Sequence, residues 1–213
     1  QNAFKNTPYE VDPSGEEATL FKLRSSNIKS YYGGLLNKNR MFLVVTGKIS
    51  KQELIEKIKN SFAEIPVKPY IAYVYEIPVF TKNTLFTEER ELATNYITGI
   101  INAPTMSSDE YVPYRLAISI LSGNLFREIR TKRNLSYSPG ARSTILKMPY
   151  TSVYVSTVNP KETVEIMVDQ LKKLKTETAS QSGLTDLKSG FFTTNYMKEE
   201  SSDAMTSSLG QAE

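Results

Sequence analysis

Residues 125–137 read LFREIRTKRNLSY and form the densest polar cluster in the chain. Leu125 and Ile129 stand four residues apart, which is the spacing of neighbours on one face of a helix. This apolar pattern begins near residue 110 and predicts a long helix over about 110–133. We expect the helix to end in a group of cations and to be followed by a strand that bears Tyr137.

Two interpretations of this charged helix end are open. Cations are stabilised near a helix C-terminus by the macrodipole, each by about 0.3 to 1 kcal/mol, so the cluster has an ordinary structural explanation. In the functional interpretation, Arg130 and Tyr137 converge on one anionic or carbonyl-rich target. Arg recognises such oxygens through planar hydrogen bonds and a Tyr hydroxyl can donate to a developing oxyanion, so this pair is the candidate site.

The segments around this stretch predict a mixed fold. Three segments rich in β-branched and aromatic residues are expected to be strands, 92–101, 136–145 and 151–158, the last two as an antiparallel pair. An N-cap signature at Asn159-Pro160 predicts an amphipathic helix to about residue 174, and a final helical stretch is expected from about Leu184. The order predicts an α+β fold with helices layered on one face of a largely antiparallel sheet.

The N-terminal third predicts a different arrangement. After a polar connector, a short helix is expected from Ser26, and residues 41–46 (MFLVVT) are a continuous β-prone run that predicts a strand buried on both faces. Ser50 and Glu53 have the spacing of a capping box, which predicts a helix start. Residues 66–83 hold three prolines and no sustained period, so a linker is expected there.

The composition excludes several kinds of site. The sequence contains no His and no Cys, which excludes Ser-His-Asp triads, thiolate nucleophiles and zinc sites built from imidazole or thiolate ligands. The net charge of +3 comes from interspersed Lys and Glu, so nucleic acid is not an expected partner. The sequence also lacks the roughly 18 consecutive apolar residues of a membrane span, so no membrane partner is expected.

The charged stretch also resembles a known signature. Arg130 and Tyr137, seven residues apart in LFREIRTKRNLSY, are similar to the pair found in the second, non-zinc half of the inverted-zincin metallopeptidases. This is the pitrilysin and insulinase family, which includes the mitochondrial processing peptidases. The likeness extends over roughly residues 20–210 and includes the run at 41–46 that ends at Gly47.

The resemblance implies a half-unit of a two-half zinc peptidase. Residues 1–65 would hold a connector and the closing helix, strand and helix of the preceding half, 66–83 the linker, and 84–213 most of the C-terminal domain. In that family the first half carries H-x-x-E-H and a distal Glu. Carried over, Arg130 would bind a substrate carbonyl, and Tyr137 would be the catalytic group that stabilises the tetrahedral intermediate.

The resemblance also implies the partners. This chain would hold no cofactor, and zinc would lie in a partner, either an N-terminal half or a separate subunit, with a peptide as the shared substrate. Because the chain begins with Gln1, we expect it to be a piece of a longer protein that is inactive alone. A homo-oligomer of the isolated piece is also expected, because the apolar run at 41–46 would lack its cover.

Two alternatives to this reading remain open. The chain could instead belong to a scaffold or assembly subunit that kept the fold and lost the chemistry. It could also be a binding module of the α+β class that is unrelated to proteolysis. An H-x-x-E-H motif with a later Glu, encoded upstream, would distinguish the peptidase from the scaffold.

Overall fold

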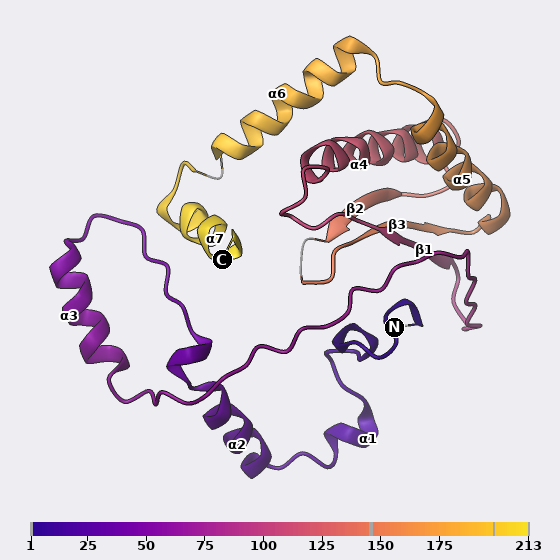
Figure 1. Cartoon of the computed structure of the whole chain (residues 1–213). Coiled ribbons are helices and arrows are strands. Elements are labelled where there is room, and N and C mark those ends of the chain that lie inside the picture. Colours follow the sequence, from indigo (N-terminus) through magenta and orange to yellow (C-terminus); the bar gives the residue numbers. More distant parts are fainter. Residues whose placement is uncertain (1, 145–146, 198, 213) are drawn as a thin grey trace. The chain divides into compact units, whose positions relative to one another are not determined.

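The computed structural model describes residues 2–144, 147–197 and 199–212. The chain forms two compact units, which we describe separately (Figure 1). The first unit comprises Gln1–Glu10 and Tyr75–Ser189, and the second comprises Val11–Val74 and Gly190–Glu213. This division does not test the domain boundaries expected after residues 65 and 83, which remain predictions.

The first unit contains a three-stranded sheet. Its strands are β1 (Asn95–Asn102), β2 (Gly140–Thr144) and β3 (Tyr150–Thr157). The order across the sheet is β1-β3-β2, and both neighbouring pairs are antiparallel. The predicted strands and the predicted antiparallel pair are confirmed, although part of the expected segment 136–145 is not strand and residue 145 lies outside the described residues.

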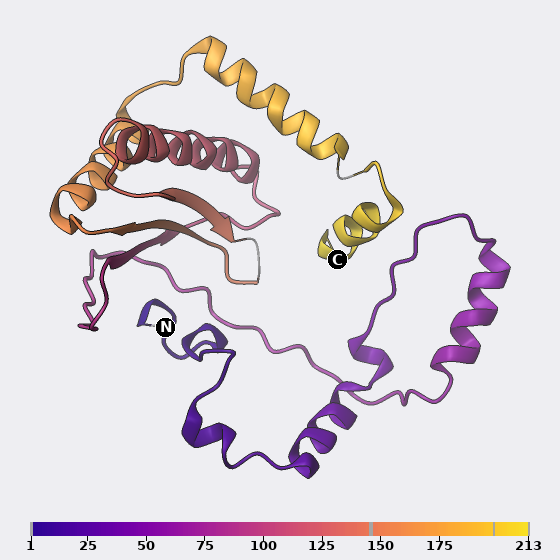
Figure 2. The same cartoon turned by 180° about the vertical axis from the view of Figure 1, so that it is seen from behind.

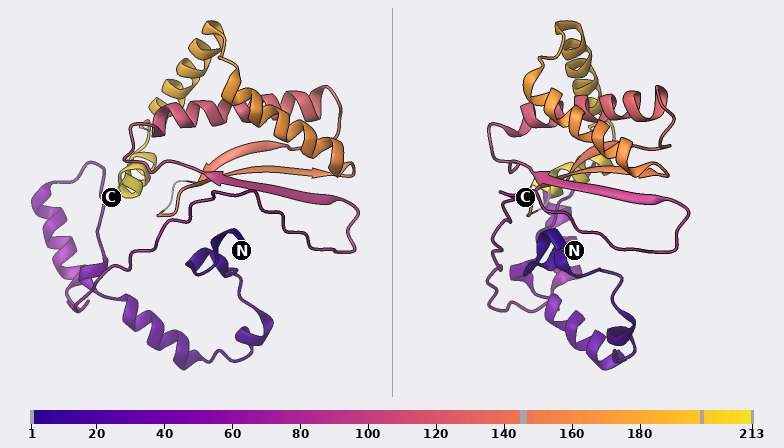
Figure 3. Two further views of the ribbon diagram at one scale, coloured as in Figure 1. Left: turned by 45° about the vertical axis from the view of Figure 1, so that its right-hand side comes forward. Right: turned by 90° about the vertical axis from the view of Figure 1, so that its right-hand side faces the viewer.

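Two helices cover one face of this sheet. They are α4 (Tyr111–Leu125) and α5 (Pro160–Thr176), which lie on the same side of the strands when seen from the front, from behind and from the side (Figure 1, Figure 2, Figure 3). Asn159 precedes Pro160 as the N-cap residue, as expected, and its side chain bonds to Glu162. The predicted α+β class, with helices on one face of the sheet, is confirmed.

The core of this unit lies between the helices and β3. It is made of buried apolar side chains from four segments: Ile118, Leu121, Leu125, Ile129, Val153, Val155 and Met167. The apolar pattern of the predicted helix places Leu121, Leu125 and Ile129 on the core face, and all three are buried. The same apolar pattern places Val112 on the core face, but Val112 lies in the first turn of α4 and is 46% exposed.

The first ten residues belong to the sheet-bearing unit and are not only a polar connector. Phe4 is buried and its ring centroid lies 4.9 Å from that of Tyr150 and 6.0 Å from that of Phe80. The Asn102 side chain fixes the Phe80 backbone, because it donates to the Phe80 carbonyl and accepts from the Phe80 N–H. An aromatic cluster therefore fixes the N-terminal segment beside the end of β1.

The second unit is mostly helical. Its helices include α1 (Glu17–Leu20), α2 (Ser25–Leu35), α3 (Lys51–Phe62) and α7 (Ser202–Ala212), while α6 (Gln181–Met197) begins in the first unit. Ser50 caps α3 by accepting a hydrogen bond from the Glu53 N–H at 3.2 Å, as the sequence predicts. Residues 66–83 hold no helix or strand, and their role as a linker remains a prediction. None of the described helices combines the length and apolar character of a membrane span.

The prediction of a buried strand at residues 41–46 is wrong for this structure. Met41 has extended backbone angles, but no strand pairs with the segment among the described residues. Phe42 is 61% exposed and Leu43 is 53% exposed. Thr46 at the end of the segment hydrogen-bonds to α7 through the Ser202 carbonyl. An apolar run forms a buried strand only where a neighbouring strand and a covering layer are available, and the described chain supplies neither.

We expect the isolated chain to self-associate through this exposed run. Unpaired, apolar extended segments bind one another through backbone hydrogen bonds and apolar contacts. Light scattering should give a mass above 24.0 kDa that rises with concentration, together with binding of a hydrophobic dye. The double substitution Phe42→Ser and Leu43→Ser should reduce both signals. Ile71→Ser, at a position 93% exposed, is the matched control, and an equal effect of both variants would contradict the prediction.

Candidate functional site

The predicted site residues lie where α4 ends. Beyond Leu125 the helix widens into a π-helical turn over Phe126–Thr131, a feature that is often found at functional sites. Asn134 then adopts a left-handed conformation with φ 51°, which Asn tolerates better than most residues. The Asn134 N–H donates to the Arg130 carbonyl and the Leu135 N–H to the Ile129 carbonyl, both at 2.9 Å. These bonds close the helix end and direct the chain back toward Tyr137.

Arg130 and Tyr137 are in direct contact. The Arg130 guanidinium donates a hydrogen bond of 2.7 Å to the Tyr137 carbonyl oxygen. Its central carbon also lies 4.1 Å from the centroid of the Tyr137 ring and 5.1 Å from that of Phe126. Attraction between a cation and aromatic faces holds the guanidinium against both rings. The fold therefore brings together the two residues singled out from the sequence.

The Tyr137 hydroxyl does not point into the core, because the side chain is 78% exposed. A guanidinium carries five N–H donors, and within the described residues one bond of the Arg130 side chain is recorded, the one to Tyr137. The remaining donors and the hydroxyl can therefore hydrogen-bond to a ligand. Phe126, which orients Arg130, was not identified from the sequence, because a partly exposed Phe at a helix end carries no distinctive pattern.

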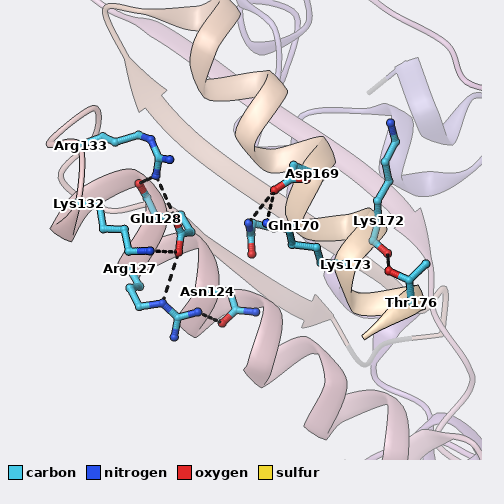
Figure 4. A network of polar contacts seen from close by, with 10 residues as sticks. All are labelled: Asn124, Arg127, Glu128, Lys132, Arg133, Asp169, Gln170, Lys172, Lys173 and Thr176. Atoms are coloured by element: carbon cyan, nitrogen blue, oxygen red, sulfur yellow. Dashed lines mark hydrogen bonds and ion pairs between the residues drawn. The ribbon is translucent and has the colours of Figure 1, made fainter. Parts of the chain in front are cut away.

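Glu128 neutralises most of the cationic cluster. Figure 4 shows Arg127, Lys132 and Arg133 converging on its carboxylate. The distances are 2.8 Å to Lys132 Nζ, 2.9 Å to an Arg133 terminal nitrogen and 3.5 Å to Arg127 Nε. Arg130, by contrast, forms no ion pair among the described residues. The cluster thus divides into a structural group around Glu128 and a separate Arg130–Tyr137 pair, a division that charge spacing alone does not reveal.

The same contacts perturb the ionisation of Glu128. Hydrogen bonds from Lys132 and Arg133 lower the pKa of the Glu128 carboxyl from 4.5 to about 2. The ionised form is favoured in the folded state, so this stabilisation is present above the unfolded pKa of about 4.5 and is lost as the pH falls toward about 2.

We expect Glu128→Gln to lower the free energy of unfolding at neutral pH by about 1 to 2 kcal/mol, because three cations lose their common partner. The difference from the unsubstituted chain should shrink as the pH falls between about 4.5 and 2. Urea unfolding, followed by circular dichroism at pH values from about 2 to 7, measures this difference in the free energy of unfolding. Glu88→Gln, which removes a pair on exposed chain, is the matched control. A difference that does not change with pH would contradict the prediction.

The described residues contain no group of three or more acidic side chains that could hold a metal ion. Because the sequence also lacks His and Cys, the donor set of a zinc site is not present in them. The site therefore consists of an Arg, a Tyr hydroxyl and the rings that position them. Such groups can bind and polarise carbonyl oxygens.

A comparison with protein-family models shows to which family the chain belongs. The family model described as the Peptidase M16 inactive domain matches residues 22–191. The chain therefore belongs to this family, and the resemblance to the second half of an inverted-zincin metallopeptidase is confirmed. No curated protein matches the chain.

Several solved structures share the fold. The chain is similar to the peptidase M16 inactive domain from Pseudomonas fluorescens, with 16% identity, a TM-score of 0.80, and coverage of 97% of this chain and 51% of the other. A protease from Helicobacter pylori gives 17% identity, a TM-score of 0.78, and coverage of 99% and 54%. The periplasmic protease PqqL from Escherichia coli gives 13% identity, a TM-score of 0.57, and coverage of 76% and 19%. The chain thus spans about half the length of the first two.

Proposed function

We propose that this chain is the non-zinc half of a zinc-dependent endopeptidase. In this proposal Arg130 binds a carbonyl oxygen of the substrate and Tyr137 donates a hydrogen bond to the tetrahedral intermediate. The observation that carries the proposal is the Arg130–Tyr137 contact, in which the guanidinium is oriented by two rings and the Tyr side chain remains exposed. Membership of a family described as an inactive peptidase domain supports it.

The geometry suits the proposed roles for a physical reason. The guanidinium is held by Tyr137 and Phe126, so it loses little conformational entropy when a substrate carbonyl accepts its remaining donors. The Arg130 guanidinium carbon lies 4.1 Å from the centroid of the Tyr137 ring, and this contact favours one position of the ring that carries the hydroxyl. A donor that is already oriented stabilises a developing oxyanion without reorganising during the reaction.

The catalytic metal belongs to the partner in this proposal. A zinc-bearing half or subunit would bind the zinc and activate the attacking water, since the described residues of this chain hold no group of metal ligands. The chain spans about half of similar solved structures, which supports a second half of comparable size.

The test is to measure zinc and peptide hydrolysis with and without the partner half encoded upstream. We expect the dialysed chain alone to hold no zinc and to cleave no peptide, and the assembled pair to hold one tightly bound zinc and to cleave peptides. Tightly bound zinc in the chain alone would contradict the proposal. An assembled pair without zinc or hydrolysis would favour the scaffold subunit instead.

A further inference from the structure

We propose that Glu128 is a positioning residue for the Arg130–Tyr137 pair, because its carboxylate holds the turn that carries Arg130. This inference deepens the proposed function and rests on it for the consequence in catalysis. The effect of Glu128 on the Arg130 side chain can be measured on this chain without any hydrolysis.

The first observation is that Glu128 bonds to residues on the far side of Arg130 in the chain. One terminal nitrogen of Arg133 donates to the Glu128 carboxylate at 2.9 Å and to the Glu128 main-chain carbonyl at 2.8 Å. Lys132 Nζ donates to the same carboxylate at 2.8 Å. Because Arg130 lies between residues 128 and 132 in the sequence, these bonds close the segment that contains it.

The second observation is that the Glu128 carboxylate is less exposed than its partners. The Glu128 side chain is 13% exposed, whereas the side chains of Arg127, Lys132 and Arg133 are between 40% and 58% exposed. One carboxylate thus has three cationic partners (Figure 4). A network of charges with fixed geometry stabilises a structure more than an isolated pair on the surface does.

The third observation is that the core fixes the neighbouring residue of the same turn. Ile129 is fully buried, and its carbonyl accepts from the Leu135 N–H at 2.9 Å. The π-helical geometry of this turn is rare in proteins. Glu128 and Ile129 directly precede Arg130, so the charged network and the core together set where the Arg130 backbone lies.

The Arg130 side chain depends on that backbone position. Its guanidinium contacts the Phe126 and Tyr137 rings and donates to the Tyr137 carbonyl at 2.7 Å. Among the described residues Arg130 has no ion pair with Glu128, so Glu128 acts through the turn and not on the guanidinium itself. Without the carboxylate, the cations of segment 127–133 would repel one another and favour an opened turn. Arg130 would then lose its orientation against the two rings.

The first test is NMR of the ¹⁵N-labelled chain, with the Arg130 Nε–H signal assigned by its loss in Arg130→Lys. Ring currents of Phe126 and Tyr137 shift this signal from the position of an exposed arginine, because the guanidinium lies against both rings. In Glu128→Gln we expect the signal to move toward that position. An unchanged Arg130 signal in Glu128→Gln would overturn the proposal.

Asp169→Asn is the matched control for this measurement. It removes another ion pair between residues four apart, the one of 2.9 Å with Lys173 on α5, and leaves the turn after α4 intact. The Arg130 signal should therefore stay where it is in the unsubstituted chain. An equal shift in Asp169→Asn and Glu128→Gln would also overturn the proposal, because it would reflect a general loss of charge.

The second test is kinetic and uses the assembled pair well below its melting temperature. Glu128→Gln should lower kcat/KM on the order of 10-fold, because a displaced donor stabilises the transition state less. In an Arg130→Ala background the same substitution should have no further effect, since Glu128 acts through Arg130. An equal loss in both backgrounds would overturn the positioning role, because a substitution that only destabilises the fold acts independently of Arg130.

Arg133→Gln provides a second variant that perturbs the turn less. It removes the bonds to the Glu128 carboxylate and carbonyl, while Lys132 and Arg127 still pair with Glu128. We expect the Arg130 signal to shift in the same direction as in Glu128→Gln, with a smaller loss of kcat/KM. If Glu128→Gln does not fold, an unchanged signal and unchanged kcat/KM in folded Arg133→Gln would overturn the proposal.

The outcome is separable from that of the proposed function. A reduced kcat/KM in Arg130→Ala together with an unchanged kcat/KM in Glu128→Gln would overturn this inference alone. An unchanged kcat/KM in Arg130→Ala, or an assembled pair without hydrolysis, would overturn the role proposed for Arg130. The NMR measurement would then still decide whether Glu128 positions the Arg130 side chain.

Discussion

Tyr137→Phe is expected to lower kcat on the order of 100-fold in the assembled two-half peptidase, with little change in KM. The substitution removes the hydroxyl that would donate to the tetrahedral intermediate. It keeps the ring against Arg130 and the backbone carbonyl that accepts from Arg130, so the geometry around the missing group is preserved. Because the side chain is 78% exposed, the melting temperature should stay close to that of the unsubstituted protein.

Steady-state kinetics and thermal melting on the same preparation test this expectation. Tyr96→Phe is the matched control, because Tyr96 is also an exposed tyrosine of the sheet-bearing unit and lies outside the site. That control should leave both kcat and KM unchanged. A Tyr137→Phe variant with normal kcat but a lowered melting temperature would assign Tyr137 a structural role only.

Arg130→Ala is expected to raise KM and lower kcat together, reducing kcat/KM by roughly 10- to 100-fold. The substitution removes the donors that would bind a substrate carbonyl. It also removes the group that contacts the Phe126 and Tyr137 rings, so the Tyr137 hydroxyl becomes less well oriented. The lost stacking and hydrogen bond should lower the free energy of unfolding by about 1 kcal/mol.

Arg130→Lys separates charge from shape. Lysine keeps the positive charge but lacks the planar fork, so it should recover stability more than it recovers kcat/KM. Full recovery of kcat/KM by Lys would show that charge alone is needed. Unchanged kcat/KM in Arg130→Ala would remove Arg130 from the mechanism and leave the helix-end interpretation of the cluster.

Local sequence patterns predicted much of the sheet-bearing unit correctly. Periodicity predicts the antiparallel pair β2 and β3, the amphipathic helix α5 and the apolar face of α4. Apolar residues recur at every second position in a strand and at every third or fourth position in a helix. The cap of α3 at Ser50 was also predictable, since it depends on two residues three apart. Such features require only near neighbours in the chain.

The candidate site was predictable in composition but not in geometry. The pair Arg130 and Tyr137 could be selected by resemblance to a known motif, but nothing in the spacing indicates that the guanidinium contacts two rings. The π-helical turn and the left-handed Asn134 set this arrangement, and both depend on how the helix end closes. The role of Glu128 as the shared partner of three cations likewise depends on the path of the chain after α4.

The sequence alone determined the class of fold, the family and the absence of imidazole and thiolate ligands, because these depend on residue identity and short-range order. Tertiary structure decided which strand edges and apolar runs find partners. Among the described residues β2 pairs only with β3, and Phe42 and Leu43 remain exposed although the composition of residues 41–46 is that of a buried strand. Burial and strand pairing are properties of two segments brought together, and no single segment encodes its partner.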